Sequence, residues 1–172
     1  VAAFDTSGFV KIREDVPQSA FIDIDNDEIQ PNGGTPLFDA MGRALTEMTT
    51  ETDGAVIILT DGGENSSQEY DAKIVTALVE KTEKAGIGVV YIGADFADFG
   101  DAKATGLAAT RTATTSKGNY AKTMSAMASK SNNYRSVRKA FHDGNDGSSS
   151  GLDGDMMDGL QSYAFTEEER KE

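Results

Sequence analysis

The chain has no cysteine and only one histidine, His142, among its 172 residues. Disulfide bonds, thiolate zinc sites and cysteine nucleophiles are therefore excluded, and a single histidine argues against a histidine metal site or catalytic triad. The chain also lacks an apolar run near the roughly 20 residues that a membrane-spanning helix needs. We expect a water-soluble protein in which any metal ion is bound by oxygen atoms.

Basic residues are scarce, since 16 lysines and arginines stand against 29 aspartates and glutamates, a formal net charge of −13. This charge repels a phosphate backbone, so we expect protein partners and divalent cations, and no nucleic acid. Residues 143–172 alone carry nine acids and two bases. Because residues 143–155 are nearly all Gly, Ser, Asp and Asn, we predict a flexible acidic tail with a short docking segment near its end. Residues 1–142 form the predicted folded domain.

Short apolar runs bounded by turn residues predict the strands. Val1 to Asp5 and Phe9 to Arg13, separated by Thr6-Ser7-Gly8, should form a hairpin. The run from Ala55 to Thr60 is rich in branched residues and predicts a central strand covered on both faces, and residues 87–92 repeat its pattern. A further edge strand is expected at residues 108–113.

Apolar residues at helical spacing predict the remaining elements. Thr35 is expected to cap the first helix, with Pro36 at its first position, and Ser66 and Glu69 form a capping-box pattern before the second. In chain order, the predicted helices cover about residues 36–49, the stretch between Ser66 and Gly86, residues 98–105, and residues 117–131 with an extension towards 141. Strands and helices in this order predict an α/β fold with a doubly wound, mostly parallel sheet.

In such a sheet the ligand crevice lies at the carboxyl ends of the strands. Leu59-Thr-Asp-Gly-Gly-Glu-Asn-Ser66 places the carboxylate of Asp61 there, and Gly33-Gly-Thr-Pro-Leu-Phe-Asp-Ala40 places the hydroxyl of Thr35 at a helix start. A hydroxyl and a carboxylate brought together suit Mg²⁺, which retains water ligands and needs few protein oxygens. Taken separately, Thr35 is equally well explained as a helix cap, and the Asp-Gly-Gly sequence as a turn.

These two segments resemble the second and third segments of the metal-ion-dependent adhesion site in von Willebrand factor type A domains. Val90-Tyr-Ile-Gly-Ala-Asp95 and Asn133-Tyr-Arg135 are similar to stand-alone bacterial and phage members, so the resemblance covers about residues 1–140. It implies that Thr35 coordinates Mg²⁺ through its hydroxyl and that Asp61 contacts the ion directly or through water. The implied function is a non-enzymatic binding or assembly module, cytoplasmic or virion-associated, whose Mg²⁺ accepts a carboxylate from a partner protein.

The family's first segment, Asp-x-Ser-x-Ser after an opening central strand, has no full counterpart. Asp5-Thr6-Ser7 begins like it, but Phe9 stands at the last serine position, and only 30 residues separate Asp5 from Thr35. We therefore interpret Val1 to Asp5 as the family's second strand. The missing strand would leave two unpaired strand edges. We expect them to be filled by another chain, which is a partner protein or, through self-association, a second copy, or else by a separate N-terminal piece or by residues preceding Val1. We also expect weak or no Mg²⁺ binding by this chain alone.

A second resemblance gives an enzymatic alternative. Phe21-Ile-Asp23-Ile-Asp25-Asn-Asp27 resembles the Asp-x-Asp segment of haloacid-dehalogenase-like phosphatases, in which one carboxylate attacks and its neighbour acts as acid/base beside Mg²⁺. Asp23 and Asp25 would have these roles, and Gly93-Ala-Asp95-Phe-Ala-Asp98 would be the later metal-binding segment. Against this alternative, the apolar run before Asp23 is only Ala-Phe-Ile, and a solvated acidic loop explains the same residues.

Overall fold

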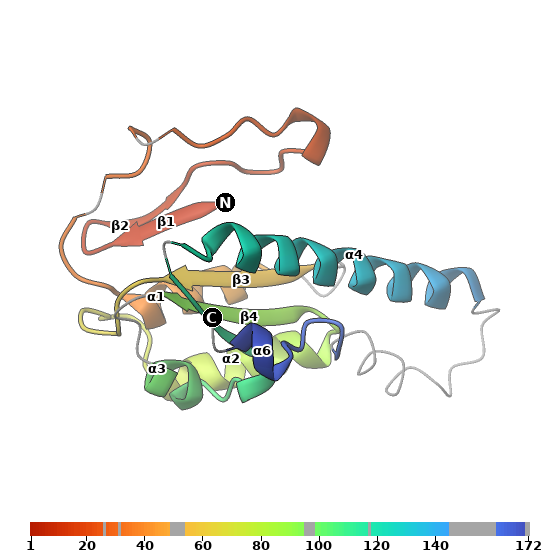
Figure 1. Ribbon diagram of the computed structural model, residues 1–172. Coiled ribbons are helices and arrows are strands. Elements are labelled where there is room, and N and C mark those ends of the chain that lie inside the picture. Colours follow the sequence, from red (N-terminus) through yellow and green to blue (C-terminus); the bar gives the residue numbers. More distant parts are fainter. Residues whose placement is uncertain are drawn as a thin grey trace.

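The protein has an α/β fold, as the sequence predicts. The computed structural model describes residues 1–25, 27–30, 32–48, 54–94, 99–116, 118–144 and 161–170. Its strands are β1 (Ala2–Asp5), β2 (Gly8–Lys11), β3 (Ala55–Thr60), β4 (Gly88–Ala94) and β5 (Thr112–Thr115). The first two form an antiparallel hairpin, and the other three form a parallel sheet in the order β3-β4-β5 (Figure 1).

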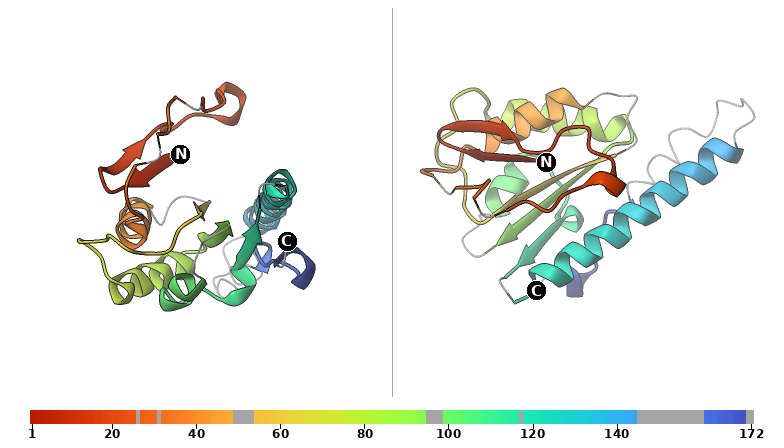
Figure 2. Two further views of the ribbon diagram at one scale, coloured as in Figure 1. Left: turned by 60° about the vertical axis from the view of Figure 1, so that its left-hand side comes forward. Right: turned by 90° about the horizontal axis from the view of Figure 1, so that it is seen from above.

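Helices cover both faces of the parallel sheet. They are α1 (Leu37–Glu47), α2 (Ala72–Lys84), α3 (Phe99–Ala104), α4 (Tyr120–Gly144) and α6 (Glu167–Arg170), with 3-10 turns at Gln18–Ala20 and Ala109–Arg111. Helices α1, α2 and α3 lie on one side of the sheet, and α4 crosses the other side (Figure 2). This is the doubly wound arrangement. No helix in the described part of the chain has both the length and the apolar character needed to span a membrane.

Most predicted elements are present, with shifted boundaries. The hairpin, the first helix and the extension of the last helix beyond residue 131 are confirmed. The predicted edge strand at 108–113 is wrong in position, because a 3-10 turn occupies Ala109–Arg111 and the strand begins at Thr112.

Strand β4 is the centre of the core. It is buried from Gly88 to Gly93, and its side chains alternate between two hydrophobic clusters. Val89 and Tyr91 pack with residues of α1 and α2, while Val90 and Ile92 pack with residues of α4 and β5. The sequence predicts the same two-sided burial for β3 and β4. In the structure β4 is the strand that is covered on both faces.

Strand β3 differs from its prediction as a central strand covered on both faces. It is an end strand of the parallel sheet, since within the described residues it pairs only with β4. Val56 and Ile58 are buried against α1, but Ile57 and Leu59 on the opposite face are 41% and 37% exposed. The physical reason is that the cluster formed by α4 with β4 and β5 reaches β3 only at Ala55 and leaves Ile57 and Leu59 on the same face outside it.

Both predicted helix caps are corrected. Helix α1 begins at Leu37, and its N-cap position is Pro36, without a capping side chain. Helix α2 is capped by Asp71, whose carboxylate accepts a hydrogen bond of 2.8 Å from the Ile74 N–H. The capping box fails because Glu69 instead forms a two-bonded ion pair with Arg43, at 2.6 and 3.0 Å.

The end of the chain returns to the body of the molecule. Tyr163 and Phe165 are buried in the cluster around Val90 and Ile92, and the Tyr163 ring lies 5.0 Å from that of Tyr134, centroid to centroid. The docking segment expected near the end of the tail thus packs on its own chain. Residues 145–160, which include most of the predicted flexible linker, lie outside the described residues, and the domain boundary at 142 stays a prediction.

Candidate functional site

The candidate site lies at the carboxyl end of β3, where the chain turns beside the start of α1. Thr35 precedes α1 and Asp61 follows β3 directly. Thr35 Oγ1 lies so close to Gly62 that a Cβ at Gly62 would be 2.6 Å from it. The structure therefore brings the hydroxyl of Thr35 beside the backbone that carries Asp61, while the metal-binding roles of both residues stay predictions.

The loop around Thr35 is held to the loop after β3 by Asn65. The Thr35 N–H donates to Asn65 Oδ1 at 2.8 Å, and the Asn65 N–H donates to the Thr35 carbonyl at 3.2 Å. This reciprocal pair fixes the two loops relative to each other. Thr60 tightens the turn further, because its hydroxyl accepts from the Gly62 N–H at 3.2 Å.

Glu64 organises the loop from within. Its carboxylate accepts backbone N–H bonds from Phe38, Ser66 and Ser67, at 2.8 to 2.9 Å, and a 2.6 Å bond from the Ser67 hydroxyl. Partial burial raises the pKa of Glu64, but the hydrogen bonds from Ser67, Phe38 and Ser66 outweigh it and hold the pKa below its ordinary value. A charged Glu64 therefore joins the start of α1 to the 61–67 loop.

Asp39, in the first turn of α1, anchors the next part of the same loop. Its two carboxylate oxygens accept the N–H groups of Gln68, Glu69 and Tyr70, each at 2.8 Å. Burial again raises the pKa, and these backbone hydrogen bonds, with the nearby Arg43 cation, lower it below the ordinary value. Asp39 and Glu64 lie within the two segments singled out from the sequence, but their role as loop anchors was missed, because it depends on contacts between residues about 30 positions apart.

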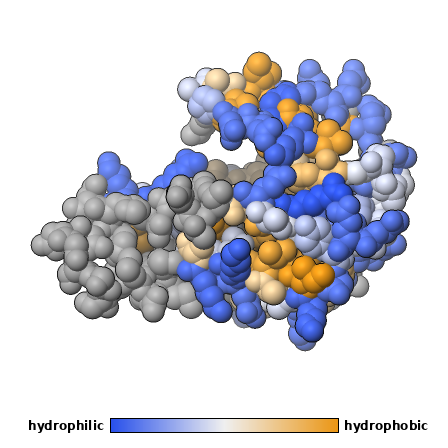
Figure 3. All heavy atoms as spheres, turned by 180° about the vertical axis from the view of Figure 1, so that it is seen from behind, coloured by the Kyte–Doolittle hydropathy of each residue, from blue (hydrophilic) through white to orange (hydrophobic). Residues whose placement is uncertain are grey.

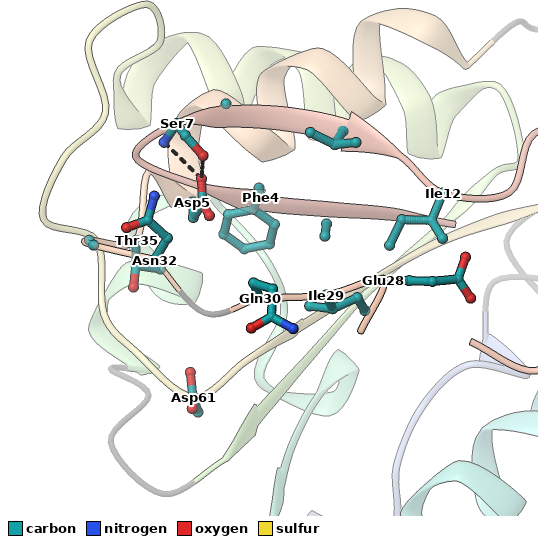
Figure 4. A pocket seen from close by; sticks show the side chains of 15 residues that line it. Phe4, Asp5, Ser7, Ile12, Glu28, Ile29, Gln30, Asn32, Thr35 and Asp61 are labelled. Atoms are coloured by element: carbon teal, nitrogen blue, oxygen red, sulfur yellow. Dashed lines mark hydrogen bonds between the residues drawn. The ribbon is translucent and has the colours of Figure 1, made fainter. Parts of the chain in front are cut away.

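The side chains of Thr35 and Asp61 line a shared cavity of about 290 Å³. Asp5 and Ser7, from the turn between β1 and β2, line the same cavity, as does Asn32 (Figure 4). Asp61 points into the cavity from the opposite side to Asp5 and Ser7. The structure thus places Asp5 and Ser7, which begin like the family's first segment, around the same space as the two predicted site residues.

Asp5 is already engaged within its own turn. Its carboxylate accepts hydrogen bonds from the Ser7 hydroxyl and, at 2.7 Å, from the Ser7 N–H. The Ser7 side-chain bond, followed by the backbone bond, lowers the pKa of Asp5 below its ordinary value. The turn is also tied to the Thr35 loop, since the Thr6 hydroxyl donates to the Asn32 carbonyl at 3.3 Å.

These oxygens would give a hard cation only an incomplete set of protein ligands. The described residues contain no group of three or more carboxylate or histidine side chains placed to hold a metal ion. The donor set consists of the exposed Asp61 carboxylate, the Thr35 and Ser7 hydroxyls and an Asp5 carboxylate that is partly used in its turn. Such a set fits Mg²⁺ that keeps most of its waters, and it is too sparse for a dehydrated ion.

The residues of the enzymatic alternative lie elsewhere. Asp23 and Asp25 are exposed in irregular chain between the 3-10 turn at Gln18–Ala20 and α1, and the element immediately before them is that turn and not a strand. The Asp25 backbone is held by Glu28, which also pairs with Arg13. Asp95 and Asp98 lie outside the described residues.

Comparisons with protein-family models, with curated proteins and with solved structures found no match for this chain.

Proposed function

We propose that the protein is a non-enzymatic binding or assembly module of von Willebrand type A architecture, with Thr35 and Asp61 as part of a Mg²⁺ site. The observation that supports the proposal most directly is the closure of the Thr35 loop onto the loop after β3, through Asn65 and the Thr35–Gly62 contact. It presents a hydroxyl and a carboxylate at the carboxyl end of a parallel strand, where α/β folds bind ligands.

The proposed mechanism uses an ion that is bound weakly by the module alone. Thr35 and Asp61 would hold hydrated Mg²⁺ at the mouth of the cavity, leaving coordination positions open. A carboxylate of a partner protein would occupy one of these positions. Glu64 and Asp39 keep the two loops in place, so that little ordering is needed when the partner arrives.

Paramagnetic broadening tests the site at the affinity that we expect. Mn²⁺, used in place of Mg²⁺, should selectively weaken the amide NMR signals of residues 34–36 and 61–65, and calorimetry with Mg²⁺ should give a dissociation constant of about 1 mM or weaker. Asp61→Asn and Thr35→Val should remove the broadening. Asp23→Asn, at an exposed carboxylate outside the site, is the matched control and should leave it unchanged.

Two outcomes would contradict the proposal. Broadening centred on residues 23–27 would move the metal site to the acidic loop, and Mg²⁺-dependent hydrolysis of an aryl phosphate that Asp23→Asn abolishes would establish the phosphatase alternative. A low-micromolar Mg²⁺ affinity that depends on Thr35 and Asp61 would show that the site is complete, against the interpretation that a segment is missing.

A further inference from the structure

Two strand edges face a common groove. Within the described residues, β3 forms strand pairs only with β4, and β1 only with β2. A groove of about 500 Å³ lies between them, lined by Ala2, Ala3 and Phe4 of β1 and by residues 56–60 of β3. Backbone N–H and C=O groups along a free strand edge pair readily with an added strand.

Several exposed apolar side chains lie in this groove. Val1, Ile29, Ile57, Leu59 and Tyr120 all line it, and all are more than a third exposed. In a space-filling view the hairpin and the chain after it overhang the body across a hollow, and hydrophobic surface lies on the overhanging part (Figure 3). Apolar surface gathered in one place indicates a site that another surface covers.

The apolar lining extends to both faces of β3. On the α1 face, Val56 and Ile58 continue towards Met41, Ala44 and Phe4. On the opposite face, Ile57 and Leu59 lie beside their register partners on β4, Val90 and Ile92. Tyr120 of α4 also lines the groove. A β-strand places successive side chains on opposite faces, so an added strand would bury apolar residues on both.

The charge of the groove lining indicates which kind of segment would bind there. Asp61 is the only charged side chain among the described residues that line the groove, and it stands at the carboxyl end of β3. The chain as a whole carries a net charge of −13. A segment that is neutral along its length and basic at the end near Asp61 complements this lining.

We propose that the groove between β1 and β3, when no metal ion is bound at Asp61, binds an extended, apolar peptide segment of a partner protein, with a basic residue beside Asp61, as an added strand of the sheet. This inference rests on the proposed function of a protein-binding module and names the chemistry of the partner. The binding energy comes from backbone hydrogen bonds to the β3 edge and from burial of side chains on both faces.

A designed peptide tests the proposal. The probe is a fluorescein-labelled heptapeptide with a core of alternating valine and isoleucine and a lysine at each end. Fluorescence anisotropy in EDTA should show saturable binding, with a dissociation constant of about 10–100 µM. A peptide with proline at its centre, which cannot continue a strand ladder, should not bind, and one with glutamate ends should bind more weakly at low salt.

Variants of the protein locate the binding. The double substitution Ile57→Ser and Leu59→Ser changes exposed side chains and should weaken binding about tenfold or more. Ile74→Ser is the matched control, because Ile74 is also 45% exposed but lies on α2 outside the groove lining. Hydrogen exchange should show new protection of β3 amides when the peptide is present, and circular dichroism should confirm that each variant is folded.

Three results would overturn the proposal of an added strand. Equal binding of the proline peptide, or equal binding to the double variant, would overturn the proposal, as would a dimer of this chain that excludes the peptide. Because the assay is in EDTA, its result is separate from that of the metal site. Peptide binding without Mn²⁺ broadening would reject the metal site alone, and broadening without peptide binding would reject the added strand alone.

Discussion

Strands β3 and β4 are paired neighbours with similar apolar sequences, yet their surroundings differ. β4 is buried from Gly88 to Gly93, whereas β3 exposes Ile57 and Leu59. The difference arises from what lies beside each strand. β4 has a strand on each side and helices on both faces. β3 has the groove at one edge, and on the face towards α4 only Ala55 packs against the cluster that α4 helps to form. An apolar run therefore indicates what a strand is suited to contact, and the neighbours determine how much of it is buried.

A second contrast lies on either side of the candidate site. Towards α1, Asp39 and Glu64 bind the backbone of the 66–70 loop with short hydrogen bonds. Towards β1, the same region opens into the groove and ends at the exposed Asp61. The molecule thus combines a firmly organised loop with an open strand edge, an arrangement suited to docking a partner without reshaping the loop.

The largest predicted effect compares the two strands directly. Ile92 and Leu59 are register partners on the same face of the sheet, with exposures of 0% and 37%. Ile92→Ala should lower the free energy of unfolding by about 3 kcal/mol because it leaves a cavity, whereas Leu59→Ala should cost about 1 kcal/mol or less. Urea unfolding followed by circular dichroism measures both.

Equal losses in the two variants would break the comparison between the strands. They would show that Leu59 is covered in solution, as it would be if another segment already occupied the groove. Repeating the measurement at several protein concentrations separates self-association from this outcome, because self-association makes the apparent stability depend on concentration.

The organised side of the site gives the next prediction. Asp39→Asn keeps the shape of the side chain but turns an NH₂ group towards backbone N–H donors, and it should cost about 2 kcal/mol at pH 7. The pKa of Asp39 is below its ordinary value in the folded protein, so its charged form adds stability above about pH 4 that is lost as the pH falls through the folded pKa. The difference between wild type and variant should therefore shrink below about pH 4.

The control for this prediction is an exposed acid. Asp23→Asn removes an exposed carboxylate in irregular chain and should change the stability little. A constant difference between wild type and Asp39→Asn down to pH 2 would show that the charge of Asp39 does not stabilise the loop.

Much of the fold could be predicted from local patterns, and the limits have physical causes. The α/β order, the hairpin and the two segments of the candidate site follow from apolar runs, helical spacing and turn residues. The exposure of Ile57 and Leu59 could not be predicted, because it depends on where α4 crosses the sheet. The position of Asp5 and Ser7 beside Thr35 likewise depends on how the hairpin folds over the chain that follows it.

Helix caps show the same limit on a smaller scale. Ser66 and Glu69 match a capping box as a local pattern, but Glu69 pairs with Arg43, 26 residues away, and Asp71 caps the helix instead. The local pattern was outweighed by an ion pair and by the loop contacts of Glu64. A short segment of sequence cannot show whether a side chain such as Glu69 bonds to its own helix or to a residue far away in the chain.

The smallest predicted effect tests this choice of cap. Asp71→Ala removes the acceptor of the Ile74 N–H and should lower the free energy of unfolding by about 1 kcal/mol, the usual loss for an N-cap carboxylate. Ser66→Ala removes a hydroxyl that does not cap α2, so the loss should be about half of that or less. Asp71→Ser, which retains an oxygen at the cap position, should recover most of the stability. Thermal unfolding of the three variants at one protein concentration measures the order. A larger loss for Ser66→Ala than for Asp71→Ala would mean that the helix begins at the capping box in solution. The loop beside the candidate site would then be shorter, and the Asp39 contacts with residues 68–70 would be broken.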